Sequence, residues 1–98
     1  MRMNSPASTT LRCVVYRSRA AVTFSPSALK MLELLCASRN HTRGISGRLH
    51  YVDGQFVHVL EGPAEMVGKL LGVIKEDPRH TGLTILLDRQ VSGRAFTL

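Results

Sequence analysis

The chain has 98 residues, 44% of them hydrophobic, and a mean hydropathy of +0.03. That length allows one small domain whose apolar residues share a single core. A formal net charge of +6 favours an anionic partner such as nucleic acid, a phospholipid surface or a phosphorylated small molecule. No apolar run is long enough to span a membrane, and the polar residues 1–10 lack a signal-peptide core, so we expect a cytoplasmic protein without membrane insertion.

The chain begins with a segment, residues 1–10, that is rich in Ser, Thr and Asn, and we expect a flexible leader there and a domain over residues 11–98. Residues 11–17 are β-branched and aromatic at their centre, which predicts a strand with Val14 and Tyr16 on one face. Ser25 and Pro26 then form a helix start. The apolar stripe of this helix is expected to contain Leu29, Leu32, Leu35 and Cys36, and Lys30 and Glu33 should lie on the opposite side. The helix is expected to end near residues 39–40.

Two strands, residues 45–52 and 55–60, flank Asp53 and Gly54, a pair typical of a type I′ hairpin turn. A two-residue loop fixes the register, so that Leu49 faces His58 and Tyr51 faces Phe56. These side chains then share one face of the sheet with Leu60. The pattern therefore predicts a titratable group, His58, on an apolar surface.

A second helix is expected to begin at Pro63 and to stop before Pro78, with an apolar stripe of Met66, Val67, Leu70, Leu71 and Ile74. Residues 83–87 read as a further strand, and residues 91–98 as the start of one more. The order is β-α-β-β-α-β. We therefore predict an α+β, ferredoxin-like fold, a mainly antiparallel sheet with two helices on one face.

The common catalytic and phosphate-binding motifs are absent from the sequence. Cys13 and Cys36 are far apart in the sequence and form no C-x-x-C pair. We therefore expect two small buried side chains rather than a disulfide or a metal site. The four histidines have no close pair spacing, and no metal is expected. RNA recognition on this fold needs aromatic side chains on the open sheet face, whereas the hairpin places its aromatics toward the helices, so nucleic acid is not the expected partner.

Four blocks in this order and spacing resemble the BLUF family, the sensors of blue light using FAD. They are V-V-Y-R-S at residues 14–18, N-H-T-R-G-I-S-G at 40–47, F-V-H-V-L-E-G at 56–62 and D-P-R-H at 77–80. The resemblance covers about residues 11 to 96. It implies a flavin, expected as FAD with FMN or riboflavin as alternatives, whose ring lies between the two helices.

The resemblance also implies roles for single residues. Tyr16 matches the family's redox-active tyrosine, and Asn40 matches the asparagine whose amide bonds the pyrimidine edge of the ring. Asp77, Arg79 and His80 match positions that line the ring edge and tail, and Leu32 and Ile74 would supply apolar walls. The residues alone also permit a core tyrosine at 16, a turn residue at 40, a satisfied core histidine at 58 and a solvated turn at 79–80.

The sequence departs from the family at the photoswitch, because His58 stands where the family has a glutamine between tyrosine and flavin. A neutral imidazole also offers one donor and one acceptor, but it has no terminal amide and it titrates near neutral pH. The family also carries Trp and Met just past the Phe96 position, so we expect a short last strand. An altered photocycle is therefore expected.

These features predict a photosensory domain without enzymatic activity that signals through a partner protein. The alternative is a degenerate BLUF-like interaction module without flavin, in which Val15, Val57 and Val59 on the outer sheet face would suit a homodimer or a helical partner. A small acyl-phosphate hydrolase of the same fold is a third hypothesis, but no glycine-rich loop with a following Arg precedes the first helix.

Overall fold

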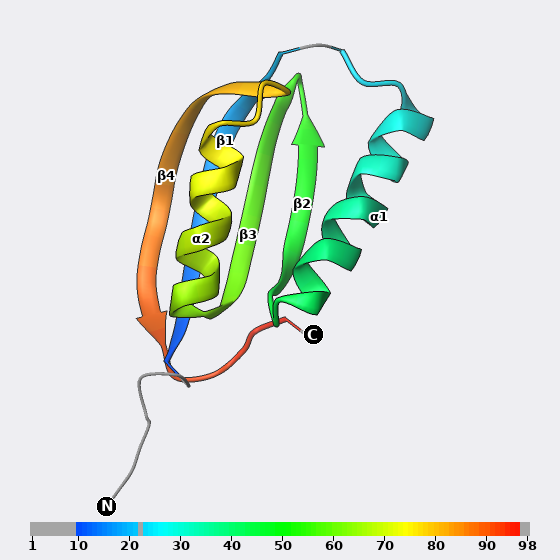
Figure 1. Ribbon diagram of the computed structural model, residues 1–98. Coiled ribbons are helices and arrows are strands. Elements are labelled where there is room, and N and C mark those ends of the chain that lie inside the picture. Colours follow the sequence, from blue (N-terminus) through cyan, green and yellow to red (C-terminus); the bar gives the residue numbers. More distant parts are fainter. Residues whose placement is uncertain (1–9, 22, 97–98) are drawn as a thin grey trace, which may run out of the picture.

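The computed structural model describes residues 10–21 and 23–96 (Figure 1). Apart from Thr10, the expected flexible leader lies outside these residues. The elements are β1 (Leu11–Ala20), α1 (Pro26–Thr42), β2 (Ser46–Val52), β3 (Gln55–Pro63), α2 (Ala64–Lys75) and β4 (His80–Val91). Within the described part of the chain, no helix is long and apolar enough to cross a membrane.

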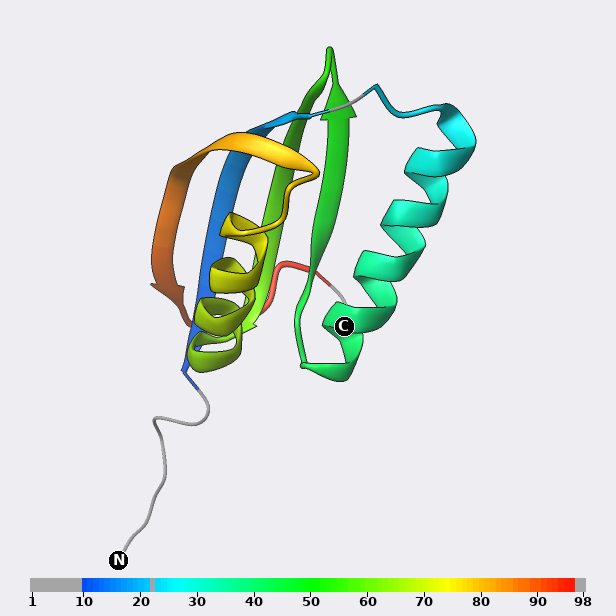
Figure 2. The same ribbon diagram turned by 45° about the horizontal axis from the view of Figure 1, so that its top comes forward.

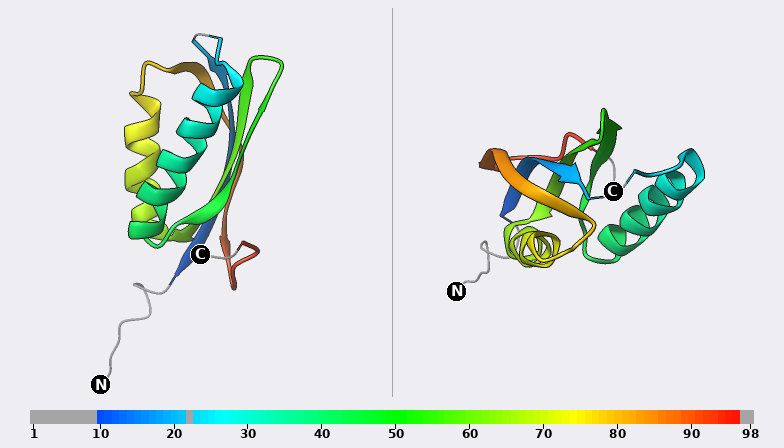
Figure 3. Two further views of the ribbon diagram at one scale, coloured as in Figure 1. Left: turned by 90° about the vertical axis from the view of Figure 1, so that its right-hand side faces the viewer. Right: turned by 90° about the horizontal axis from the view of Figure 1, so that it is seen from above.

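The four strands form one sheet in the order β2-β3-β1-β4, and each neighbouring pair is antiparallel. Both helices lie on the same face of this sheet (Figure 3). The predicted α+β, ferredoxin-like order is therefore confirmed.

The β2–β3 hairpin has the predicted turn and register. Asp53 and Gly54 both adopt positive φ, 51° and 76°, as a type I′ turn requires. Leu49 pairs with His58 and Tyr51 with Phe56. His58 therefore lies on the helix-covered face, directly opposite Tyr16 of β1.

The core lies between α2 and the middle of the sheet. Its buried members are Val14, Tyr16, Ile45, Leu60, Val67, Leu70, Leu71 and Ile74. Four of them come from α2 and three from β1 and β3, whereas none comes from α1. The sheet and α2 thus form the rigid base on which the rest of the molecule is built.

Helix α1 begins as predicted, with the Ser25 hydroxyl accepting a hydrogen bond from the Ala28 amide at 3.2 Å. It lies beside the β2 edge rather than over the sheet centre (Figure 2), and Asn40 is its buried residue. The predicted stripe is wrong at Leu35, which is 58% exposed. The apolar side chains of α1 thus form no continuous face against the sheet.

Strand β4 extends beyond the predicted residues 83–87 at both ends. Its backbone pairs with β1 from His80 to Val91, although most of its side chains are exposed. Arg12 binds Asp88 with two hydrogen bonds, of 2.8 and 2.7 Å. The expected additional strand does not form in the described residues 92–96.

Residues 94–96 are instead fixed by a buried acidic residue, Glu61. The Glu61 carboxylate accepts hydrogen bonds from the amides of Ala95 and Phe96 at 2.7 and 3.0 Å. Arg94 donates to the Ser46 hydroxyl at 2.8 Å and to the Gly44 carbonyl oxygen at 2.6 Å. We call this set of contacts the Glu61–Arg94 clamp.

Both cysteines are free and only half-buried, so the expectation of buried side chains is corrected. Cys13 lies on the outer sheet face, which no helix covers, and Cys36 lies on the side of α1 that faces the sheet. Neither cysteine is surrounded by other side chains on all sides, so neither is fully buried.

Candidate functional site

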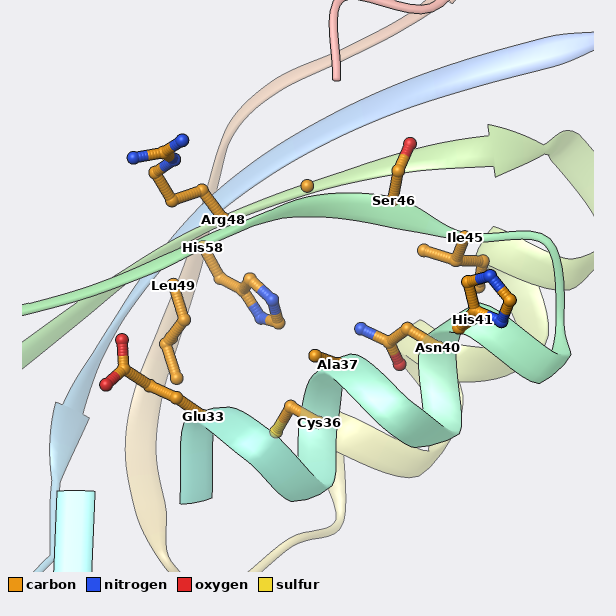
Figure 4. A pocket seen from close by; sticks show the side chains of 11 residues that line it. Glu33, Cys36, Ala37, Asn40, His41, Ile45, Ser46, Arg48, Leu49 and His58 are labelled. Atoms are coloured by element: carbon orange, nitrogen blue, oxygen red, sulfur yellow. The ribbon is translucent and has the colours of Figure 1, made fainter. Parts of the chain in front are cut away.

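A cavity of about 430 Å³ lies between α1 and the β2–β3 hairpin. In Figure 4, His58 and Leu49 point from the sheet toward α1, and Cys36, Ala37 and Asn40 face them from the helix. Glu33, expected on the solvent side of the helix, also lines this cavity, so that expectation is corrected. The volume falls in the range of about 300–1,000 Å³ typical of small-molecule sites.

A second, smaller pocket of about 40 Å³ adjoins the cavity between α1 and the end of α2. Cys36, Leu49 and His58 line both. The second pocket is lined in addition by Tyr16, Leu32, Arg39, Phe56, Ile74, Asp77, Arg79 and His80. The cavity and the smaller pocket therefore meet at His58, and α1 forms one wall of each.

The site residues expected from the sequence are spread along the chain from β1 to the start of β4, yet the fold gathers them here. Seven line the smaller pocket: Tyr16, Leu32, His58, Ile74, Asp77, Arg79 and His80. The eighth, Asn40, lines the adjoining cavity.

Tyr16 and His58 are paired directly across β1 and β3. The Tyr16 hydroxyl lies 2.9 Å from His58 Nδ1, and both side chains are 4% exposed. Burial lowers the pKa of His58 to about 4, with further contributions from Arg39 and His80. Burial also raises the pKa of Tyr16 above its usual range. Both groups are therefore neutral at pH 7, and the single hydrogen bond joins an uncharged phenol to an uncharged imidazole.

The loop after α2 supplies an ion pair at the pocket rim. Asp77 accepts two hydrogen bonds of 3.0 Å from Arg79 Nε and one of 2.9 Å from the Arg79 amide. These bonds lower the pKa of Asp77 to about 2. The His80 ring stacks on Tyr16 with 6.2 Å between ring centroids, and burial lowers its pKa.

Asn40 is held by its backbone while its side chain reaches the cavity. Its carbonyl oxygen accepts from the amides of Arg43 and Ile45 at 3.0 and 2.9 Å, which fixes the end of the helix. Its side-chain Oδ1 is buried and has no hydrogen-bond partner among the described residues. A buried polar atom without a partner costs about 1–3 kcal/mol, so this oxygen favours a ligand that brings a donor.

The site thus combines apolar walls, a neutral tyrosine–histidine pair and an unpartnered acceptor. A flat heterocycle with an N–H group on one edge matches these features. Among the described residues, no group of three or more His, Cys, Asp or Glu is placed to hold a metal ion.

The smaller pocket is also lined by four residues that were not among the expected site residues: Cys36, Arg39, Leu49 and Phe56. Arg39 could have been found, because it lies seven residues after Leu32 and three after Cys36 on the predicted apolar stripe. A charged residue at such a position points toward the interior of the protein.

Residues 11–98 match the family model described as BLUF: Sensors of blue-light using FAD. A photoactivated adenylate cyclase subunit beta from Euglena gracilis is 37% identical over 94 residues, which cover 96% of this chain. The chain spans only 11% of the length of that relative.

Two solved structures share the fold. One is described as BlrB, a BLUF protein, in the dark state; it has a TM-score of 0.80 and 30% identity, and covers 91% of this chain and 67% of its own. The other is Klebsiella pneumoniae BlrP1 with FMN and cyclic diGMP, with a TM-score of 0.80 and 33% identity over 89% of this chain and 23% of its own.

Proposed function

The chain belongs to the BLUF family, and on that premise we propose that it is a flavin-binding blue-light sensor domain that signals through a partner protein. The observation that carries the proposal is the site itself, where the hydrogen-bonded pair of Tyr16 and His58 lies beside a cavity lined by Asn40, whose buried side-chain oxygen has no partner among the described residues. This combination suits a flavin because its pyrimidine edge carries an N–H donor between two carbonyl acceptors.

When bound, the flavin would supply blue-light absorption and an acceptor for an electron. The chain's own residues would do the rest. Asn40 Oδ1 would accept the ring N–H, and Leu32 and Ile74 would exclude water from the ring faces. Tyr16 would be the electron donor, with its hydroxyl proton held toward His58. Asp77, Arg79 and His80 would line the edge of the ring and the start of the tail.

His58 is where this domain would differ from its family. The family's glutamine can rotate its amide, whereas an imidazole whose Nδ1 accepts from Tyr16 presents only the Nε2–H on its other side. The exchange of donor and acceptor that a rotating amide provides would then require a change of tautomer. We therefore expect the light-induced spectral shift to be weak or absent.

FAD is the proposed cofactor, and FMN or riboflavin would satisfy the same ring contacts. We propose that the domain is cytoplasmic and not itself an enzyme. Relatives such as the photoactivated cyclase and BlrP1 are much longer than this chain, which supports a partner or effector domain as the receiver of the signal. We also propose a homodimer or higher oligomer; the contact through Val15, Val57 and Val59 of the outer face belongs to the alternative, an interaction module without flavin.

The direct test is the absorbance spectrum of the purified protein after incubation with FAD. We expect bound flavin with its vibrational structure sharpened, and a blue-light difference spectrum with at most a weak red shift. Protein that stays colourless would contradict the proposal and would favour the alternative, an interaction module without flavin.

The role of His58 is tested by His58→Gln, with His50→Gln as control because His50 is an exposed residue of β2. The His58 variant should gain the red shift of the family, and the His50 variant should behave like the unchanged protein. If neither variant shows the shift, the histidine is not what alters the response.

A further inference from the structure

The thiol of Cys36 lies where the cavity and the smaller pocket meet. Among the residues of α1, only Cys36 lines both, and it does so together with Leu49 and His58 of the hairpin. Cys13, the other cysteine, lies on the outer sheet face, away from both. The described site therefore contains one thiol, and this thiol shares the smaller pocket with the hydrogen-bonded pair of Tyr16 and His58.

A second feature of the same cavity points to a ligand beside this thiol. Asn40, four residues after Cys36, is 6% exposed, and its Oδ1 has no hydrogen-bond partner among the described residues. Leu32, four residues before Cys36, lines the smaller pocket. Residues four positions apart lie on one face of a helix, about 6 Å apart along its axis. A flat ring that contacts both Asn40 and Leu32 therefore passes Cys36, which lies between them.

The thiol is held in its protonated form in the dark. Burial raises the pKa of Cys36, and the nearby guanidinium groups of Arg39 and Arg79 offset this effect only in part. Sγ accepts a weak hydrogen bond from a terminal nitrogen of Arg39 at 3.8 Å, so this contact does not use the S–H proton. A protonated thiol is a poor nucleophile. Cys36 should therefore not react with an oxidised flavin in the dark.

We propose that Cys36 is the reactive residue of a second light response, in which its thiol adds to the photoexcited flavin ring. The inference rests on the proposed function. The S–H bond breaks, its hydrogen passes to N5 of the ring, and the sulfur forms a bond to the adjacent carbon C4a. Because the thiol adds across a double bond, no atom or electron is gained or lost, and no external oxidant or reductant is needed. The reverse step restores the thiol and the ring in the dark.

The pair of Tyr16 and His58 is a weak competitor for the excited ring. An electron donated by Tyr16 returns to it unless the hydrogen bonds around the pair rearrange, and the imidazole lacks the amide rotation that would give a rearranged product. Addition of the thiol instead forms a covalent bond, which persists after the excited state has decayed. The histidine that should weaken the red shift therefore leaves the thiol reaction as the source of a lasting product.

The experiment illuminates the FAD-loaded protein with blue light and follows the visible flavin band and the free thiols, both per bound flavin. Cys36→Ser is compared with Cys13→Ser, the matched control, in which Cys36 is the only thiol left. We expect the unchanged protein and the Cys13 variant to lose most of the band and a single titratable thiol, and to recover both in the dark. The Cys36 variant should keep its band.

Three outcomes would contradict the proposal in different ways. Equal bleaching in the Cys36 variant would overturn it, because another donor would then reduce the ring. Bound flavin without any loss of thiol in the unchanged protein would also overturn it and would leave the proposed function intact. If the unchanged protein binds no FAD in the dark, the proposed function and this inference fail together.

The position of the thiol can be tested without light. With FAD at about ten times its dissociation constant, alkylation of Cys36 by iodoacetamide in the dark should slow about tenfold, whereas alkylation of Cys13 should not change. Mass spectrometry of the peptides measures both rates. Equal alkylation of Cys36 with and without FAD would contradict a thiol that lies against the ring.

Tyr16→Phe tests whether the thiol reacts directly. This variant lacks the hydroxyl of the competing donor, so the light-driven loss of the Cys36 thiol should be as fast as in the unchanged protein or faster. Loss of the thiol reaction in Tyr16→Phe would mean that the tyrosine carries the electron first, and would overturn direct addition.

Discussion

At the scale of single residues, the site is built from groups held in uncharged or unpartnered forms. Burial keeps Tyr16 and His58 neutral while β1 and β3 hold them 2.9 Å apart. In the described part of the chain, the buried side-chain oxygen of Asn40 has no hydrogen-bond partner, and the helix end is fixed by the Asn40 backbone carbonyl. Such groups cost stability in the free protein and become useful when a ligand arrives.

The first prediction concerns the stability of the flavin-free protein toward acid. The pKa of His58 is about 4 in the folded protein, whereas a histidine of the unfolded chain keeps its ordinary value of 6.5. Between these values only the unfolded chain binds the proton, so stability is complete above pH 6.5 and falls as the pH decreases toward 4. The slope should approach about 1.4 kcal/mol per pH unit in denaturant titrations.

His58→Gln should lack this slope, and His50→Gln should keep it. His80 and Asp77 contribute in the same direction in all three proteins, so the comparison isolates His58. Parallel pH profiles for the two variants would show that His58 is already accessible to protons in the folded protein.

The second prediction separates stability from binding at Asn40. Asn40→Ala removes the unpartnered buried oxygen, so the free energy of unfolding of the flavin-free protein should stay unchanged or rise by about 1 kcal/mol. Flavin affinity should fall about tenfold because the acceptor for the ring N–H is lost. Denaturation and flavin titration measure the two effects, and a loss of both stability and affinity would assign Asn40 to the fold alone.

At the scale of elements, the two helices are anchored unequally. Helix α2 buries Val67, Leu70, Leu71 and Ile74 in the core. Helix α1 buries only Asn40 and leaves Met31, Leu34 and Leu35 more than half exposed. Since α1 forms a wall of both the cavity and the smaller pocket, whereas α2 contributes Ile74 to the smaller pocket, a ligand would contact mainly the less anchored helix.

The third prediction follows from this difference. In the flavin-free protein, amide hydrogens of α1 should exchange much faster than those of α2, because local opening of α1 disrupts few buried contacts. Addition of FAD should slow exchange in α1 and leave α2 nearly unchanged. Equal protection of both helices before FAD is added would contradict the unequal anchoring.

The fourth prediction tests the hairpin that carries His58. Gly47 has a φ of +152°, and a Cβ there would lie 1.8 Å from the Val59 carbonyl oxygen. Gly47→Ala should therefore destabilise the protein by about 3 kcal/mol or more. Gly72→Ala is the control, because this exposed position in α2 has nothing within 4 Å of the added Cβ, and it should stabilise by about 0.5–1 kcal/mol.

At the scale of the whole molecule, the features that could be predicted from the sequence are those that depend on local patterns and on strand pairing. Asp53 and Gly54 determined the turn, the turn determined the register, and the register placed His58 opposite Leu49. The length of β4 and the exposure of Leu35 could not be predicted, since both depend on how the neighbouring elements are placed. Arg39 was missed because amphipathic patterns assign charged residues to the solvent face.

The basic residues behind the net charge of +6 differ in the contacts that they make. Arg12, Arg79 and Arg94 are engaged in structural bonds, to Asp88, Asp77 and the Glu61–Arg94 clamp. Arg39 is the arginine whose buried nitrogen the described fold leaves without a partner. Arg12, Arg79 and Arg94 therefore serve the fold.

Ser46 belongs to both faces of the sheet. It lines the cavity, yet its side chain points to the opposite face (Figure 4), where its hydroxyl accepts from Arg94. A shift of the cavity wall would thus alter the bonds that hold the amides of Ala95 and Phe96 against the Glu61 carboxylate. The chemical shifts of these two amides would then serve as a built-in reporter of cavity occupancy, readable without any signal from the chromophore.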